Sequence, residues 1–312
     1  MQFWHLMEKK SYLFLGIILL FLTGCKQPSG KTSIKDESEF SFSFMTDIHL
    51  QPERASEAGF QWAIREVNKR NPDFVITGGD LVMDPLVQAY SRVDSLFNRY
   101  IELSGKFNMP IYNTIGNHDV FAWQSNEEDI EKHPEFGKRM YEQRIGPLYY
   151  SFDHKGWHFI ILDAVNLEER GAYRGKIDEE QMAWIAEDLK QIDHQTPIAI
   201  STHFPFVSSA FQLTMGPTAK IPRGLVIQNA HRVLALFSDF NLKLVLQGHL
   251  HYLEDIFVQN QVHFITGGAV CGKWWNNTPD SKPEEGFVMI HLKGEELEWE
   301  YVDFGWTPPE DI

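Results

Sequence analysis

Five short polar blocks are spread along this 312-residue chain, and each follows a short apolar stretch with the composition of a buried β-strand. The apolar stretches are residues 42–45, 74–77, 111–114, 198–201 and 244–246. Open α/β sheets collect their ligand-binding groups at the carboxyl ends of the strands. We therefore expect the five blocks to meet at one edge of the fold, although they are far apart in the sequence.

The blocks consist of carboxylate, imidazole and amide side chains, with glycine beside three of them. In chain order they are Asp47-x-His49, Gly79-Asp80, Gly116-Asn117-His118-Asp119, His203 and Gly248-His249-x-His251. Such donors suit manganese, iron, zinc or nickel rather than copper(I) or an iron–sulfur cluster. Each block alone is weak evidence, because a Gly-Asp pair is an ordinary turn and a single histidine is commonly a packed core residue. Five blocks in a fixed order argue against coincidence.

The ordered set resembles the calcineurin-like metallophosphoesterase superfamily, whose pattern is D-x-H, G-D, G-N-H-[DE], H and G-H-x-H, over about residues 42–264. The resemblance implies an α/β fold, a four-layer α/β/β/α sandwich of two mixed β-sheets flanked by helices. It also implies hydrolysis of a small phosphomonoester or phosphodiester. The implied cofactors are two divalent or mixed-valence metal ions (Mn, Fe, Zn or Ni), with a bridging hydroxide as the nucleophile. The identity of the ions, the natural substrate and the oligomeric state stay open.

The same resemblance assigns the ligands and makes Asp80 the bridge between the two ions. The other ligands form two sets, Asp47, His49 and His251 for the first ion and Asn117, His203 and His249 for the second. Spacing adds an expectation of its own, since residues i and i+2 of an extended segment point the same way, so that Asp47 and His49 reach one ion. Two divalent ions outweigh two carboxylates and a hydroxide, so the site attracts phosphate locally.

His118 stands next to a ligand but is not expected to bind metal. By resemblance it is the general acid, which stabilises the transition state and protonates the leaving oxygen. The alternative is a histidine that only supports the ligands. Asp119 or Asp84 is expected to orient its ring, and the sequence does not choose between them.

Two regions near the blocks are candidates for substrate contacts. Trp274 and Trp275 follow the strand after His251, so the two indoles are expected to wall the pocket, with core packing as the alternative. Residues 120–146 form an insertion that is either a specificity cap or inert surface. Met83 occupies the position of a tyrosine ligand in purple acid phosphatases, which argues against an iron–tyrosinate enzyme.

The first two dozen residues read as an export signal. Lys9 and Lys10 precede an apolar run that ends at Leu22, well short of the roughly 20 residues that span a bilayer. The sequence Leu22-Thr23-Gly24-Cys25 resembles a bacterial lipobox, which implies acylation of Cys25. An uncleaved anchor and an ordinary secretory signal are the alternatives. We predict a lipoprotein signal peptide (1–24), a flexible tether (25–39) and a phosphoesterase domain (40–312). The protein would then be exported and lipid-anchored to a bacterial cell membrane, periplasmic or surface-exposed.

Charge and cysteine content narrow the partners. The net charge of −15 disfavours stable binding to nucleic-acid backbones. If Cys25 is acylated, Cys271 has no second cysteine, so no disulfide is expected. A second class of function, a non-catalytic metal-binding scaffold or binding protein on the same fold, stays open beside the hydrolase.

Helices and hairpins are expected between the blocks. Residues 53–70 have apolar positions at helical spacing and end at Asn71-Pro72. A second helix is expected after Asp178, with a buried stripe that includes Ile185 and Leu189. Three hairpins are predicted, at 149–153 with 157–162, 256–258 with 262–266, and 287–292 with 297–302.

Overall fold

The computed structural model describes residues 39–169, 171–275 and 284–307. These residues all belong to one compact unit, Glu37–Ile312. The predicted signal peptide, Cys25 and the tether up to residue 38 lie outside the described residues. Glu39, which we assigned to the tether, is the first residue of a strand.

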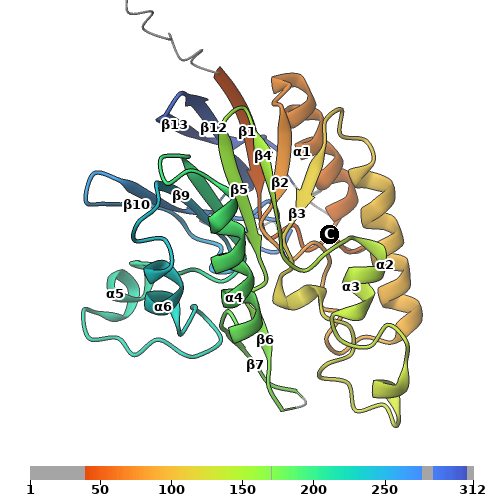
Figure 1. Ribbon diagram of the computed structural model, residues 1–312. Coiled ribbons are helices and arrows are strands. Elements are labelled where there is room, and N and C mark those ends of the chain that lie inside the picture. Colours follow the sequence, from red (N-terminus) through yellow and green to blue (C-terminus); the bar gives the residue numbers. More distant parts are fainter. Residues whose placement is uncertain (1–38, 170, 276–283, 308–312) are drawn as a thin grey trace, which may run out of the picture. The chain divides into compact units, whose positions relative to one another are not determined.

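One sheet has five strands in the order β13-β12-β1-β2-β3 (Figure 1). Its strands are β1 (Glu39–Met45), β2 (Phe74–Thr77), β3 (Ile111–Asn113), β12 (Gly286–Lys293) and β13 (Glu296–Asp303). The first three are parallel to one another, while β12 runs antiparallel to β1 and to β13. Three polar blocks therefore follow neighbouring parallel strands and leave this sheet at the same edge.

The second sheet has six strands in the order β10-β11-β9-β8-β5-β4. Its strands are β4 (Tyr150–His154), β5 (Trp157–Leu162), β8 (Ile198–Thr202), β9 (Leu242–Gln247), β10 (Leu253–Val258) and β11 (Val262–Gly267). The four central strands are parallel and the two edge strands antiparallel. The three predicted hairpins are confirmed.

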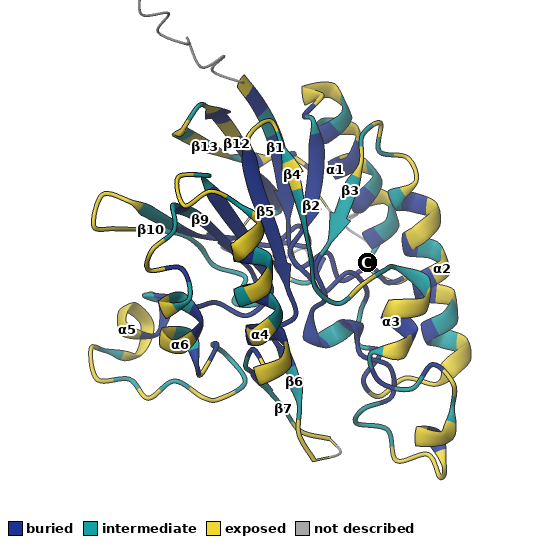
Figure 2. Cartoon of the chain, in the orientation of Figure 1, coloured by how far each residue is buried: buried dark blue, intermediate teal, exposed yellow. Residues whose placement is uncertain are grey.

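Alternating side chains give each sheet two apolar faces, as the period of two along a strand requires. One buried cluster takes Phe42 and Phe44 from the first sheet and Phe159 and Leu246 from the second, so it lies between the sheets. The strand positions in between, such as Ile160, join a second cluster with helical side chains. Figure 2 shows central strands such as β2 and β5 buried and the outer helix faces exposed. The predicted four-layer sandwich is confirmed.

Long helices cover the outer faces of the sheets: α1 (Ser56–Arg70) and α2 (Tyr90–Ser104) lie beside β2 and β3, and α4 (Glu179–Asp188) lies over β5 (Figure 1). Asp178 caps α4 by accepting a hydrogen bond from the Gln181 backbone, as predicted. The sequence analysis missed α2.

Shorter elements connect the layers. They are α3 (Arg139–Arg144), α5 (Ala210–Met215), α6 (Ala230–Ala235), the 3-10 turns Asn117–Asp119, Ile130–Lys132 and Leu189–Gln191, and the two-stranded sheet of β6 (Val165–Leu167) and β7 (Tyr173–Gly175). The β6–β7 hairpin was not predicted. Within the described ranges, no helix has the length and apolar character needed to cross a membrane.

Candidate metal centre

One carboxylate oxygen lies at the centre of the converging blocks. Asp80 Oδ2 is 3.6 Å from His49 Nε2 and 3.2 Å from His203 Nε2. The Asp80 side chain is 2% exposed and those of both histidines are fully buried. His49 comes from the loop after β1 and His203 from the end of β8, so Asp80 faces donors from both sheets.

The first group of donor atoms joins Asp47, His49 and His251. His251 Nε2 lies 3.1 Å from His49 Nε2 and 3.3 Å from Asp47 Oδ1. His49 Nε2 lies 3.8 Å from Asp47 Oδ1. The structure thus brings together the three side chains that we predicted for the first ion.

The second group joins Asn117, His203 and His249 on the other side of Asp80. His203 Nε2 lies 3.1 Å from Asn117 Oδ1 and 3.2 Å from His249 Nδ1. His249 and His251, which are two residues apart in the chain, therefore belong to different groups. This is the division that the family resemblance implied.

The donors fit metal ions in spacing and in chemistry. Two ligands about 2.1 Å from one ion are separated by about 3.0 to 3.4 Å at octahedral or tetrahedral angles. The distances within the two groups lie in or slightly above this range. In addition, Asp47 Oδ1 is buried and has no hydrogen-bond partner in the described part of the chain, as expected for an atom that binds a cation.

The backbone around the donors is strained. Five predicted ligands have left-handed φ angles between 46° and 70°: Asp47, His49, Asp80, His249 and His251. Residues other than glycine rarely adopt this conformation, which costs about 1–3 kcal/mol each and clusters at functional sites. Our extended-segment argument for Asp47 and His49 is therefore wrong in its reasoning, because two turns, not a strand, direct both side chains to one place.

Two glycines of the blocks allow the loops to approach. A Cβ atom on Gly116 would lie 2.1 Å from Asp80 Oδ1. One on Gly248 would lie 2.0 Å from Thr46 Oγ1 and 2.8 Å from Asp47 Oδ2. Any side chain at either position would displace a predicted ligand, which gives the glycines of the sequence pattern a steric reason.

Hydrogen bonds outside the donor groups fix the ring orientations. His203 Nδ1 donates to the Gly78 carbonyl at 2.8 Å, so Nε2 is free to bind a cation. His249 Nε2 donates to the Gly224 carbonyl at 2.9 Å, which leaves Nδ1 for the site. Such partners fix the tautomer of a metal-binding histidine.

Charge within the site shifts the pKa values of the donors in opposite directions. Burial lowers the pKa of His203 and His251, but the charges of Asp80 and Asp47 outweigh it and raise them to about 9 and about 11. Burial holds the pKa of His49 at about 4. The pKa of both carboxylates is lowered, against the effect of burial, by His203 for Asp80 and by His251 for Asp47. Metal ions bound at His203 and His251 would displace a proton from each ring.

A family model described as calcineurin-like phosphoesterase matches residues 40–253. The chain belongs to the calcineurin-like phosphoesterase family. The resemblance that we inferred from the five blocks is thereby confirmed, and with it the prediction of an enzyme that hydrolyses phosphoesters with metal ions.

Three relatives show how far the likeness extends. This phosphoesterase is 22% identical to the 3′,5′-cyclic adenosine monophosphate phosphodiesterase CpdA of Haemophilus influenzae over 218 residues, 66% of this chain and 68% of that protein. It is 28% identical to purple acid phosphatase 15 of Arabidopsis thaliana over 174 residues, 54% of this chain but only 29% of that protein. A dimetal phosphatase from Danio rerio has the same fold, with a TM-score of 0.63, 14% identity and coverage of 85% of this chain and 96% of that one.

In this phosphoesterase, His118 lies at the border between the first donor group and solvent. Its ring meets the His49 ring edge-on, with centroids 4.9 Å apart, and its side chain is 20% exposed. Its Nδ1 is 3.7 Å from Asp84 Oδ1. Asp119 instead accepts hydrogen bonds from the backbones of Leu81 and Gly116, both at 2.8 Å. Of the two carboxylates that we considered for orienting the ring, Asp84 faces it and Asp119 holds the loops together.

The two tryptophans take different places. Trp274 is half-buried, and its ring lies 4.3 Å from the His49 ring and 4.6 Å from the His251 ring, so it walls the first donor group. Trp275 is 1% exposed and donates to the Ile48 carbonyl at 2.9 Å. Its ring also fills the space beside Gly59, where a Cβ would lie 2.3 Å away. Trp275 therefore packs in the core, the alternative we had left open, and does not line the pocket.

Two residues next to the donors carried no sequence signal. Tyr173 places its hydroxyl 3.2 Å from Asn117 Nδ2, and Cys271 places Sγ 3.9 Å from His251 Nδ1. Tyr173 belongs to the unpredicted hairpin, and a cysteine without a partner gave no reason to look at Cys271.

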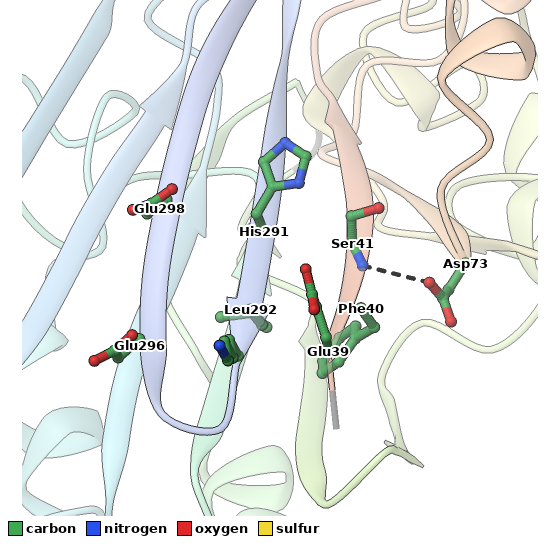
Figure 3. A pocket seen from close by; sticks show the side chains of 9 residues that line it. Glu39, Phe40, Ser41, Asp73, His291, Leu292, Glu296 and Glu298 are labelled. Atoms are coloured by element: carbon green, nitrogen blue, oxygen red, sulfur yellow. Dashed lines mark hydrogen bonds between the residues drawn. The ribbon is translucent and has the colours of Figure 1, made fainter. Parts of the chain in front are cut away.

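A separate surface pocket lies at the opposite end of β1. It has a volume of about 290 Å³, and four of its lining residues are acidic: Glu39, Asp73, Glu296 and Glu298. Figure 3 shows these side chains around the first residues of β1, where the Ser41 backbone donates to Asp73. Because Asp47 follows the other end of this strand, the pocket is distinct from the metal centre.

Proposed function

We propose that this phosphoesterase hydrolyses a small phosphomonoester or phosphodiester at a two-ion centre, with the ligands assigned from the sequence. One observation carries the proposal: two groups of donor atoms, each spaced for one ion, share Asp80 Oδ2. A bound ion pair of this kind supplies Lewis-acid stabilisation of the phosphoryl oxygens and an activated water. Manganese, iron, zinc and nickel all suit these nitrogen and oxygen donors.

His118 is the proposed general acid. It borders the donors through His49 and reaches solvent, so a substrate at the ions would lie against its ring. Asp84 stabilises the protonated ring from behind, and the proton passes to the leaving oxygen as its bond to phosphorus breaks. A leaving alkoxide needs this proton at neutral pH.

Trp274 is the proposed substrate contact. Its indole packs against His49 and His251 and so forms one side of the first donor group. A flat apolar leaving group would pack on this surface, whereas phosphate alone would not reach it. Affinity for phosphoesters with an aromatic leaving group is therefore expected to depend on Trp274.

A non-catalytic scaffold is the alternative that the sequence left open. Every donor of both groups is present around Asp80, most of them fully buried, and His118 is in place beside them. A scaffold would not need the complete set, so the geometry favours hydrolysis.

The test is an assay of the purified protein after removal of metal and reloading with manganese, iron, zinc or nickel in turn. An aryl phosphomonoester and a bis-aryl phosphodiester serve as substrates. We expect turnover of at least one of them, with two ions bound per chain. Two bound ions with no turnover of either ester would instead support the scaffold.

The proposed location is a bacterial membrane surface, through acylated Cys25. The support is the lipobox-like sequence before Cys25 and the polar segment after it. In a bacterial host, Cys25→Ser should release the protein from membranes or leave an unprocessed precursor. Equal fatty-acid labelling of the wild type and Cys25→Ser would contradict the anchor.

A further inference from the structure

We propose that Tyr173 is a positioning residue for the second ion, and that the β6–β7 hairpin supports it in that role. Its hydroxyl holds the amide of Asn117 so that Oδ1 faces His203 and His249. This inference rests on the proposed two-ion function and adds a residue that lies outside the five blocks.

The Asn117 amide needs an external partner because its two ends are chemically opposite. Only the carbonyl oxygen can bind a cation, while the NH₂ group would repel it. Oδ1 lies 3.1 Å from His203 Nε2, and Nδ2 donates to the Tyr173 hydroxyl at 3.2 Å. Among the described residues, the Tyr173 hydroxyl is the one acceptor for Nδ2, so it stabilises the orientation in which Oδ1 can bind metal.

The strand that carries Tyr173 is held at the base of the hairpin. The next residue but one, Gly175, forms a parallel bridge with Ile227 and accepts a hydrogen bond from the Gln228 backbone at 2.9 Å. A Cβ on Gly175 would lie 2.4 Å from the Val226 carbonyl oxygen, so the two segments are in close contact.

The hairpin is also held near its turn, by the insertion at 120–146. Trp123 Nε1 donates to the Ala172 carbonyl at 2.8 Å, and the Trp123 carbonyl accepts from the Gly171 backbone at 3.1 Å. The insertion that we considered as a cap thus braces the strand that carries Tyr173.

The segment that anchors the hairpin also orients a second ligand. Gly224, three residues before Ile227, provides the carbonyl that accepts from His249 Nε2 at 2.9 Å. Two of the three donors that belong only to the second group, Asn117 and His249, are therefore held from one connected unit. Loosening this unit should weaken the second ion and leave the first unchanged.

The test is titration of the metal-depleted full-length protein with Mn²⁺ alone, followed by calorimetry and elemental analysis. Tyr173→Phe should weaken one of the two ions by about 10-fold or more, since loss of a partner behind a metal ligand costs 10- to 100-fold in affinity. The other ion should bind as in the wild type, and the melting temperature of the metal-free protein should not change.

Tyr150→Phe is the matched control. It also removes a hydroxyl that makes one hydrogen bond, here to the Asn113 carbonyl at 3.0 Å, but outside the donor groups. Both ions should bind to it with wild-type affinity.

A double-mutant cycle separates positioning from a direct effect. If Tyr173 acts through Asn117, Tyr173→Phe should add no loss of affinity in the Asn117→Ala background. Two results would overturn this inference but not the two-ion centre. One is an equally large further loss of metal affinity when Tyr173→Phe is added to Asn117→Ala, and the other is wild-type affinity for both ions in Tyr173→Phe. A wild-type protein that binds fewer than two ions would instead overturn the two-ion centre on which the inference rests.

Discussion

The two donor groups are built in different ways. The first group is backed by the core: Trp275 packs beneath the loop of His49, and Thr46 Oγ1 donates to Asp47 Oδ2 at 2.6 Å. In the second group, Asn117 and His249 are backed by peripheral elements, the β6–β7 hairpin and the segment around Gly224. The difference teaches that equal ligand patterns do not imply equal support, and that the proposed second ion would depend on parts of the chain that the pattern does not include.

The largest effect should come from Asp80, the one residue that both groups share. Asp80→Asn removes the charge between the groups, so both ions should be lost or weakened, and hydrolysis should fall by about 1,000-fold or more. Elemental analysis and the aryl phosphomonoester assay measure the two effects. If Asp80→Asn still bound two ions with normal turnover, Asp80 would not be a ligand that the two groups share, and the comparison between them would fail.

His118→Asn should separate catalysis from metal binding. Both ions should remain, since no donor is lost, but turnover should fall by about 100- to 10,000-fold, the usual contribution of a positioned general acid. An activated aryl ester, whose oxygen leaves as an anion without help, should lose least and an alkyl ester most. Equal losses on both esters, with two ions retained, would favour an electrostatic or positioning role for His118.

Substituting each of the two tryptophans should show which one supports the fold beneath the first donor group and which one contacts substrate. Trp275→Ala should lower the free energy of unfolding by about 3–5 kcal/mol, because it leaves a cavity under the metal loop. Trp274→Ala should leave stability nearly unchanged and raise KM for an aryl ester. Chemical denaturation and steady-state kinetics distinguish the outcomes. If Trp274→Ala were the destabilising variant, the assignment of wall and core would be reversed.

The smallest effect should come from His158. This residue belongs to none of the five blocks, and its hydrogen-bond partners, Asp153 and Asp188, are not metal donors. Its ring nitrogens lie 2.7 Å from Asp153 and 2.9 Å from Asp188, linking β4 and β5 to α4. Burial lowers the pKa of His158, but the hydrogen bonds and charges of Asp188 and Asp153 outweigh it and raise the pKa. The protonated ring therefore stabilises the fold fully below about pH 6.5, and this contribution is lost as pH rises through the raised value.

His158→Gln should accordingly cost about 1–2 kcal/mol near pH 5.5 and less near pH 9. Asp188 sets the lower end of the pH range in which the ion pair stabilises the fold. The hydrogen bond from His158 lowers the pKa of Asp188 against the effect of burial, so the contribution of the carboxylate is lost only as pH falls through this lowered pKa. Denaturant unfolding at several pH values measures the difference. A cost that grew with pH would contradict the protonated pair, and a change in metal binding would show that His158 is no neutral reference.

Prediction from sequence succeeded where a functional residue directly follows a recognisable strand or precedes a recognisable helix. The strands before Asp47, Asp80 and Asn117 were recognisable from short apolar runs, and their parallel pairing then brings these three blocks to one edge of the five-stranded sheet. The cap at Asp178 was also predictable, because a side-chain oxygen before an acidic first turn satisfies the free backbone groups of a helix.

It failed where support comes from distant backbone contacts. The left-handed turns at Asp47 and His49 are imposed by the surrounding loops, and no preference of aspartate or histidine indicates them strongly enough. Tyr173 contacts Asn117 across the fold, so its importance depends on the placement of a short hairpin without a periodic pattern. The core position of Trp275 next to the half-buried position of Trp274 depends on one turn of the backbone at φ angles of 59° and 58°.

The donors come from loops of both sheets, so ions bound to them would also hold the two sheets together. Asp47, Asp80 and Asn117 extend from the five-stranded sheet, and His203, His249 and His251 from the six-stranded one. In the proposed arrangement each ion is therefore a clamp across the sandwich, in addition to the aromatic core between the layers. A ligand that binds only the folded state raises its stability with concentration, so the heat resistance of this protein would report the metal supply of its surroundings.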